Sequence, residues 1–170
     1  DSSYAGHVLA AWASRYLPPE KDDDALSAEP GEVHARTTID SFATDVRAGH
    51  HSFVADEPVA VGGTDTGPTP YDLLAAALAT CTSMTLKMYA RHKKLDLRSA
   101  TVRVTHGRIH AEDCEDCSAH EGMIHQFRRQ LSLVGNLDDT QRQRMLEIAD
   151  RCPVHKTLHD EIKIRTQLAR

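Results

Sequence analysis

The sequence predicts an α+β domain in which three strands precede a long helix, followed by two strands, a second helix and a closing strand. Three observations carry this prediction. Apolar residues alternate with polar ones between residues 33 and 55, an apolar run follows a glycine-rich segment at 62–70, and the alternation resumes after residue 100. This order lacks the regular repeat of strand and helix expected of a doubly wound sheet.

The first three strands are expected to be antiparallel. Val33, Ala35, Thr37 and Ile39 alternate with polar residues, which is typical of a half-buried strand. Residues 42–46 and 51–55 continue as two further strands around a turn at 48–49.

The long helix has a well-specified start. Thr69 serves as N-cap, Pro70 fits the first helical position, and Asp72 stands at the capping-box position. A helix from Pro70 to about residue 94 is roughly 37 Å long at ~1.5 Å per residue. Helical spacing places five residues on its most apolar stripe: Leu74, Ala77, Cys81, Met84 and Met88. Because 73–79 has no polar residue, we expect a sheet or a partner chain to cover this helix on more than one side.

The later elements follow the same logic. Alternation at 100–105 and again at 127–133 predicts two strands joined by a long polar loop. Asp138 and Gln141 form a second capping box, and the helix that they begin is stopped by Pro153, so that Cys152 lies at a helix end. Alternation at 162–165 predicts the closing strand.

Composition limits the classes of function. The 170 residues, 40% hydrophobic and 26% charged, fit one globular domain with an appendage. A net charge of −5 argues against nucleic acid and anionic membranes as partners. We find no leader of signal-peptide type and no run of about eighteen apolar residues, so a cytoplasmic location is expected. Four cysteines in a reducing compartment favour catalysis or metal binding over structural disulfides.

The N-terminal thirty residues are expected to be separate from the main domain at 31–170. An amphipathic helix over 3–17 ends at two prolines and is followed by an acidic linker that reaches residue 30. The eleven histidines of the chain are scattered along it and are expected mostly at the surface.

Cys81 and Cys152 are the first candidates for chemistry. A buried free cysteine is often only a small core hydrophobe, and that interpretation of Cys81 stays open. If the second helix packs across the first, the two thiols meet, which is the arrangement that a thiol peroxidase needs. One thiolate attacks the peroxide and becomes a sulfenic acid, and the other condenses with it to a disulfide that dithiols reduce. The attacking thiol requires a nearby cation or helix dipole.

A second cysteine pair, Cys114 and Cys117, lies in the polar loop with His110 nearby. A Cys-x-x-Cys flanked by histidines suits a Cys₂His₂-type zinc site. The acidic surroundings raise thiol pKa values, however, and only one such motif is present. Zinc binding, a disulfide-exchange role and an inert loop therefore remain three alternatives.

The two main motifs together resemble one known family. Residues 62–70, Gly-Gly-Thr-Asp-Thr-Gly-Pro-Thr-Pro, lead to Cys81, and residues 149–155 read Ala-Asp-Arg-Cys-Pro-Val-His. Over about 32–167 the chain resembles the OsmC and organic hydroperoxide resistance family. The resemblance implies an intertwined homodimer with an active site at each subunit interface and without a bound organic cofactor. It further implies that Cys81 is the peroxidatic thiol and Cys152 the resolving one, and that dithiols supply the electrons for reducing organic hydroperoxides or hydrogen peroxide.

The sequence departs from the peroxidase branch of that family at the residues that activate the thiolate. A glutamate follows the proline of the motif in that branch, whereas this chain has Tyr71 there and Asp72 one residue later. The family's arginine comes from the first strands, where Arg36 and Arg47 are available and Arg36 is preferred. The resemblance thus makes Asp72 and Arg36 the candidate activating pair.

A non-catalytic alternative also follows from the sequence. The N-terminal helix and linker resemble the end of an α/β-hydrolase domain, as in proteins that fuse such a hydrolase to an OsmC-like domain, which would make the present chain a C-terminal fragment. In that case the chain is an accessory or binding domain with little peroxidase activity, tethered to a hydrolase. Tyr71 in place of glutamate favours this alternative.

Overall fold

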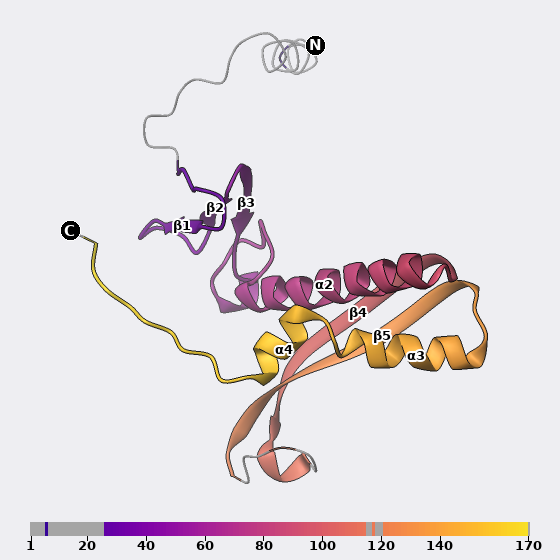
Figure 1. Cartoon of the computed structure of the whole chain (residues 1–170). Helices are drawn as coiled ribbons and strands as arrows, with labels where there is room; N and C mark the ends of the chain where they lie inside the picture. The colour runs from indigo at the N-terminus through magenta and orange to yellow at the C-terminus, as the bar shows by residue number, and fades with distance from the viewer. Residues whose placement is uncertain (1–5, 7–25, 115–116, 118–120, 170) are drawn as a thin grey trace. The chain divides into compact units, whose positions relative to one another are not determined.

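The computed structural model describes residues 6, 26–114, 117 and 121–169, and the expected N-terminal helix and most of its linker lie outside these residues. Contacts divide the chain into two compact units, Asp1–Gly67 and Pro68–Arg170. Each unit has its own antiparallel sheet (Figure 1). The predicted mixture of helices and strands is confirmed, while the domain boundary at residue 30 stays a prediction.

The first unit contains the three predicted antiparallel strands. They are β1 (Val33–Thr37), β2 (Thr44–Ala48) and β3 (His51–Ala55), paired in the order β1-β2-β3. The second strand begins at Thr44 rather than at the predicted Phe42, because the Thr44 hydroxyl donates to the Phe42 carbonyl at 2.8 Å and shapes a turn there.

The glycine-rich segment that follows is organised around one buried carboxylate. Asp56 accepts hydrogen bonds from the backbone N–H and the hydroxyl of both Thr64 and Thr66, at 2.7 to 3.2 Å. The Thr64 hydroxyl, with the backbone donors, outweighs burial and holds the pKa of Asp56 well below its usual range. A Cβ at Gly63 or Gly67 would collide with the backbone of residues 54–57, so these glycines permit the close approach of the loop.

The second unit is built on a helix and a long hairpin. Helix α2 (Pro70–Lys93) starts with the predicted capping box between Thr69 and Asp72. Strands β4 (Asp96–His110) and β5 (Met123–Asn136) pair antiparallel along their whole length. The hairpin is longer than predicted, because its ladder continues through the stretch expected to be loop as far as His110 and Met123.

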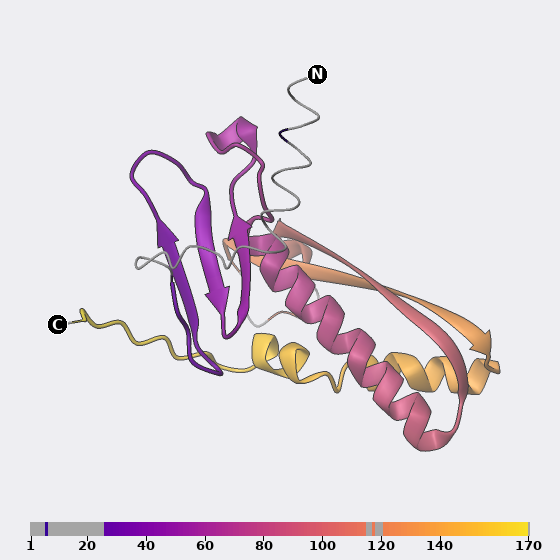
Figure 2. The same cartoon turned by 90° about the horizontal axis from the view of Figure 1, so that it is seen from above.

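Helix α3 (Asp139–Ala149) completes the core of this unit. The predicted capping box of Asp138 and Gln141 is confirmed at its start. Figure 2 shows α3 lying alongside the C-terminal half of α2, next to the hairpin. The core consists of five buried residues: Leu86, Ala90, Met145, Ile148 and Ala149. The short helix α4 (Pro153–His159) follows and contacts α2.

The buried face of α2 differs from the predicted stripe. The residues buried in the helix are Leu78, Thr82, Leu86 and Ala90, at spacings of four. Leu74, Met84 and Met88, which the stripe prediction placed inside, are 44%, 63% and 71% exposed. The hairpin and α3 cover only one side of a helix that is apolar on more than one side.

Helix α2 is also the one helix among the described residues that is long and apolar enough to cross a membrane. Length and composition alone are weak evidence for a membrane span, because the core helix of a soluble protein passes the same test.

The predicted closing strand at 162–165 is wrong. Residues 161–169 have no regular secondary structure, and Ile162 and Ile164 are 55% and 85% exposed. Alternating isoleucines favour an extended segment, but a strand also needs a neighbouring strand edge with which to pair.

Candidate active site

The structure brings the two thiols named from the sequence together. Cys81 lies in the middle of α2 and is half-buried, whereas Cys152 lies between α3 and α4 and has no exposed surface. Both are free cysteines, and their side chains share a hydrogen bond. The predicted meeting of the two helices at these residues is therefore observed.

Pro153 creates the bend that presents Cys152 to Cys81. The sequence predicts that Pro153 stops the second helix. In the structure α3 already ends at Ala149, and Pro153 is the first residue of α4. Proline has no N–H to continue a helix but fits a helix start. Cys152 is consequently the N-cap residue of α4, where the backbone N–H groups of Val154 and His155 lower the pKa of its thiol.

The surroundings of the two sulfurs shift the pKa values of the two thiols in opposite directions. Burial acts to raise the pKa of Cys152, but hydrogen bonds from Cys81, the His155 N–H, the Thr82 hydroxyl and the Val154 N–H lower it below its ordinary value. Burial raises the pKa of Cys81, and the hydrogen bond that Cys81 donates to Cys152 raises it further. The two pKa shifts thus favour the thiol form at Cys81 and the thiolate form at Cys152.

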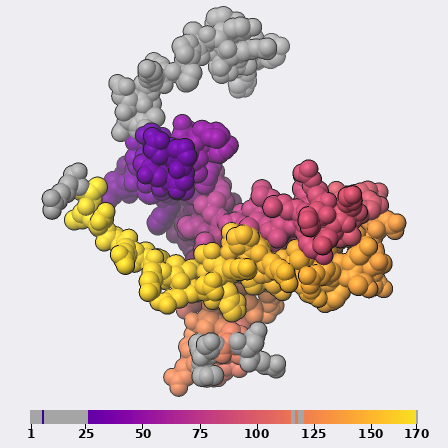
Figure 3. All heavy atoms as spheres, viewed as in Figure 1, coloured from indigo at the N-terminus to yellow at the C-terminus, as the bar shows by residue number. Residues whose placement is uncertain are grey.

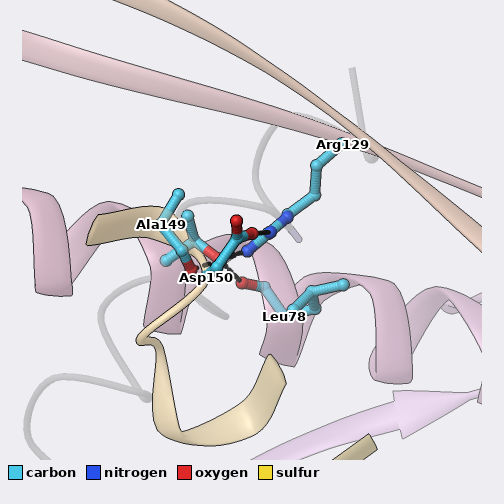
Figure 4. Close-up of polar contacts among 5 residues, drawn as sticks. Leu78, Arg129, Ala149 and Asp150 are labelled. Atoms are coloured by element: carbon cyan, nitrogen blue, oxygen red, sulfur yellow. Dashed lines mark hydrogen bonds and ion pairs between the residues drawn. The ribbon is translucent and has the colours of Figure 1, made fainter. Parts of the chain in front are cut away.

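Arg129 of β5 contacts residues that neighbour the two cysteines in the sequence. Its guanidinium donates to the Thr82 hydroxyl oxygen at 3.1 Å, to the Ala149 carbonyl at 2.9 Å and to the Asp150 carboxylate at 2.5 Å. Figure 4 shows Arg129 extending from the hairpin to the end of α3, where it donates hydrogen bonds to the Ala149 carbonyl and the Asp150 carboxylate. The cation thus links the residue next to Cys81 with the segment that carries Cys152.

Thr82 connects Arg129 to the thiols. It is fully buried, and its hydroxyl donates to the Leu78 carbonyl at 2.7 Å or to the Cys152 sulfur. A hydroxyl has one proton, so it serves one of these acceptors at a time. Arg129 donates to the same oxygen, so Thr82 joins the guanidinium to a group whose hydrogen bond lowers the pKa of Cys152.

Arg129 is not among the predicted site residues, although its place in the strand pattern carries a signal. In the alternation of β5, Phe127, Leu131 and Leu133 define one face, and Arg129 falls at a position on that same face. A charged residue at an inward position of a strand needs a partner, and such positions are often functional.

A pocket of about 330 Å³ shares Arg129 and His155 with the surroundings of the thiol pair, although neither cysteine lines it. Its lining combines apolar and basic side chains: Leu78, Phe127, Arg129, His155, Leu158 and His159. Burial, followed by the charge of Arg129, lowers the pKa of His155 below its ordinary value, which favours the neutral form of this histidine.

The two candidates for the activating pair have other partners in this chain. Asp72 caps α2 through the N–H and hydroxyl of Thr69, at 3.0 and 2.7 Å, and lies nine residues before Cys81, or about 13 Å at ~1.5 Å per residue. Arg36 belongs to the first unit, where its guanidinium lies 3.7 Å from the Asp45 carboxylate. Catalytic roles for Asp72 and Arg36 remain predictions from the resemblance.

Tyr71, at the position of the family's glutamate, packs against a histidine pair. Its ring stacks on His106 with the centroids 4.2 Å apart, and His106 and His125 share a hydrogen bond of 2.9 Å between ring nitrogens. This residue therefore has an aromatic packing role in the second unit.

The zinc alternative for the second cysteine pair does not fit the structure. Cys114 and Cys117 are joined in a disulfide, and a disulfide sulfur is not a thiolate ligand. Among the residues that the structure describes, no group of three potential ligands that includes His110 is present. The predicted alternative of disulfide chemistry remains.

Comparisons with known proteins agree with the fold. The family model for OsmC-like protein matches residues 63–167, which is more than half of the chain. The OsmC-like protein from Mycoplasma pneumoniae shares 19% identity with a TM-score of 0.59, covering 80% of this chain and 89% of its own.

Two further solved structures are similar in fold. For the organic hydroperoxide resistance protein OsmC from Legionella pneumophila the identity is 17% and the TM-score 0.57, with coverage of 79% of this chain and 90% of its own. OhrB, the organic hydroperoxide resistance protein of Bacillus subtilis, has 22% identity and a TM-score of 0.52, covering 74% and 87%. A comparison with curated proteins found no match. The chain belongs to the OsmC-like protein family, which is related to hydroperoxide resistance and redox proteins.

Proposed function

We propose that this protein is a thiol-dependent peroxidase that reduces organic hydroperoxides or hydrogen peroxide through Cys81 and Cys152. The observation that carries the proposal is the hydrogen bond between two free thiols of which only Cys81 has exposed surface. The exposed sulfur is the one that a substrate can reach. The buried sulfur is held where it can react only with its neighbour.

The two pKa shifts suggest how the reaction starts. The thiolate of Cys152 takes the proton of Cys81, and the Cys81 sulfur attacks the hydroxyl oxygen of the peroxide. The O–O bond breaks, Cys81 becomes a sulfenic acid, and the alkoxide leaves with the proton from Cys152 as an alcohol. The Cys152 thiolate then attacks the Cys81 sulfur and releases hydroxide, which forms the disulfide. An external dithiol returns both sulfurs to the thiol state.

The pocket that Arg129 and His155 line has the size and apolar lining for an alkyl peroxide. Leu78, Phe127 and Leu158 offer apolar contact to an alkyl or aryl group, in a volume of about 330 Å³. Arg129 on the same wall places a positive charge near the oxygen on which negative charge develops.

Disulfide mapping after a peroxide pulse tests the proposal. Protein reduced with dithiothreitol is mixed with about one equivalent of cumene hydroperoxide, quenched by alkylation and analysed by mass spectrometry. We expect a rapid Cys81–Cys152 bond in the wild type and none in Cys81→Ser. If both thiols remain reduced after the pulse, the peroxidase assignment fails. The alternative, an accessory domain without peroxidase chemistry, is not favoured by the comparisons.

A homodimer is part of the same proposal. The exposed apolar side chains Leu74, Met84 and Met88 form a surface along α2 that a second copy of the chain would cover. We expect sedimentation velocity to give twice the mass of one chain. A variant with Met84→Glu and Met88→Glu should be monomeric, since a dimer would bury both charges. A monomeric wild type at micromolar concentration would contradict this prediction.

A further inference from the structure

The Cys114–Cys117 disulfide lies at the end of the β4–β5 hairpin, far from the Cys81–Cys152 pair. Arg129, which reaches the thiol site, is paired with Val104, whereas the ladder ends six residues later at His110. Six residues of strand span about 20 Å at ~3.3 Å each. Figures 1 and 3 show this end of the hairpin projecting beyond the helices. The disulfide therefore cannot exchange directly with the thiol pair of its own chain in this conformation.

The hairpin has contacts other than the disulfide at this end. The strands are already held at their ends by the His110–Met123 pair of the ladder and by the hydrogen bond from the Ala111 N–H to the Gly122 carbonyl at 2.8 Å. The disulfide joins residues only three positions apart. The entropy that a cross-link removes from the unfolded chain grows with loop length, so a loop this short contributes little.

The surroundings of the disulfide are acidic. Residues 110–122 include Glu112, Asp113, Glu115, Asp116 and Glu121, and no lysine or arginine. Glu112, Asp113 and Glu121 are exposed, while both cysteines are partly exposed. The attacking group of a reductant is a thiolate, which is negatively charged and is repelled by these carboxylates. The approach is favourable when other groups near that thiolate on the reductant are positively charged.

We propose that the Cys114–Cys117 pair is a second redox-active site, separate from Cys81 and Cys152, that exchanges its disulfide with thiols or protein dithiols in positively charged surroundings. A thiolate of the reductant attacks one of the two sulfurs, the other leaves as a thiolate and takes a proton, and a mixed disulfide forms. A second thiol of the reductant then displaces the protein sulfur. The products are the Cys114 and Cys117 thiols and one disulfide of the reductant.

Reduction by two small thiols of opposite charge tests this proposal. Oxidised full-length protein is treated with cysteamine, a cation, or with 3-mercaptopropionate, an anion. Alkylation and peptide mass mapping follow Cys114 and Cys117, and rates are expressed per thiolate. We expect cysteamine to react about tenfold faster at low salt, from Coulomb energies between a few charges in water. The two rates should converge at high ionic strength because salt screens exposed charges.

Two variants complete the test. Glu112→Gln with Asp113→Asn should reduce the preference for cysteamine, since it removes two of the exposed charges. Cys114→Ser with Cys117→Ser should fold and melt within about 3 °C of the wild type, because the short disulfide loop contributes little to stability.

Three results would overturn the proposal: equal rates for the two thiols at low salt, a disulfide that resists both thiols until the protein unfolds, or a large loss of thermal stability in the double serine variant. The peroxide pulse on the double serine variant separates the proposal for Cys114 and Cys117 from the proposed peroxidase function. Formation of the Cys81–Cys152 bond there reports on the peroxidase function alone.

Discussion

Replacing Arg129 by methionine is expected to slow the peroxide-driven oxidation of Cys81 about 100-fold, the loss typical of removing one preorganised donor from an active site. The guanidinium makes three contacts, to Thr82, Ala149 and Asp150, and its side chain is only 15% exposed. Without it, the positive charge that contacts Thr82 is lost, and Thr82 is one of the groups that lower the pKa of Cys152. The pKa of Cys152 should rise as a result, and fewer molecules would hold a thiolate at neutral pH.

Arg129→Lys distinguishes the effect of the positive charge from the effect of the hydrogen-bond geometry of the guanidinium. A lysine keeps the positive charge but offers one ammonium group in place of a planar fork, so it cannot serve three acceptors in different directions. We expect an oxidation rate between those of the wild type and Arg129→Met. Stopped-flow oxidation gives the rates, and the ultraviolet absorbance of the thiolate as a function of pH gives the pKa of the pair.

The neighbouring arginine supplies a matched control. Arg128 is exposed and donates to Gln126 on the outer face of the same strand. Arg128→Met removes the same charge one residue away and should leave the oxidation rate and the thiolate titration unchanged. If Arg129→Met oxidised as fast as Arg128→Met, Arg129 would have only a structural role. That role would appear as a drop of about 5 °C in Tm, from the unsatisfied Ala149 carbonyl.

The parts of the fold that were predictable are those with local signals. Both long helices begin with a capping box that can be read from residues three apart, Thr69 with Asp72 and Asp138 with Gln141. The three early strands follow from alternation at period two. The approach of Cys81 to Cys152 was predictable because two helices with apolar faces in a small unit tend to pack against each other.

The parts that were missed depend on what lies opposite in space. Alternation in 162–165 is as good as in β1, but it does not become a strand without an edge to pair with. The apolar stripe of α2 was assigned to the wrong side, because a helix that is apolar on several sides does not indicate which side its own chain will cover.

Arg129 is a residue of the site that local sequence patterns did not identify, because its contacts also depend on what lies opposite in space. The family resemblance implies an arginine of the first strands, and that role of Arg36 stays a prediction. Arg129 of β5 reaches Thr82 through pairing and packing that span nearly fifty residues of sequence. Its position on the apolar face of β5 was visible, but its partners at Thr82 and Ala149 required the packing of the hairpin against two helices.

Cys152→Ser is expected to lower dithiol-dependent turnover about 1000-fold, because removing one member of a reacting pair abolishes the cycle. A serine hydroxyl neither forms a disulfide nor accepts the Cys81 proton at neutral pH. Peroxide should then leave Cys81 as a sulfenic acid, and excess peroxide should carry it to a sulfinic acid. Trapping with a sulfenate-specific reagent, followed by mass spectrometry, distinguishes these products.

The same variant should nevertheless make Cys81 more acidic. Burial is the largest cause of the raised pKa of Cys81, and the hydrogen bond and negative charge of Cys152 add to it. Serine removes that charge, so the pKa of Cys81 falls and its alkylation should extend to lower pH than in the wild type. A variant with Cys114→Ser and Cys117→Ser serves as the background in which only the thiol pair reacts. Unchanged alkylation of Cys81 would show that the two sulfurs do not share a proton, and the assignment of Cys152 as its acceptor would fail.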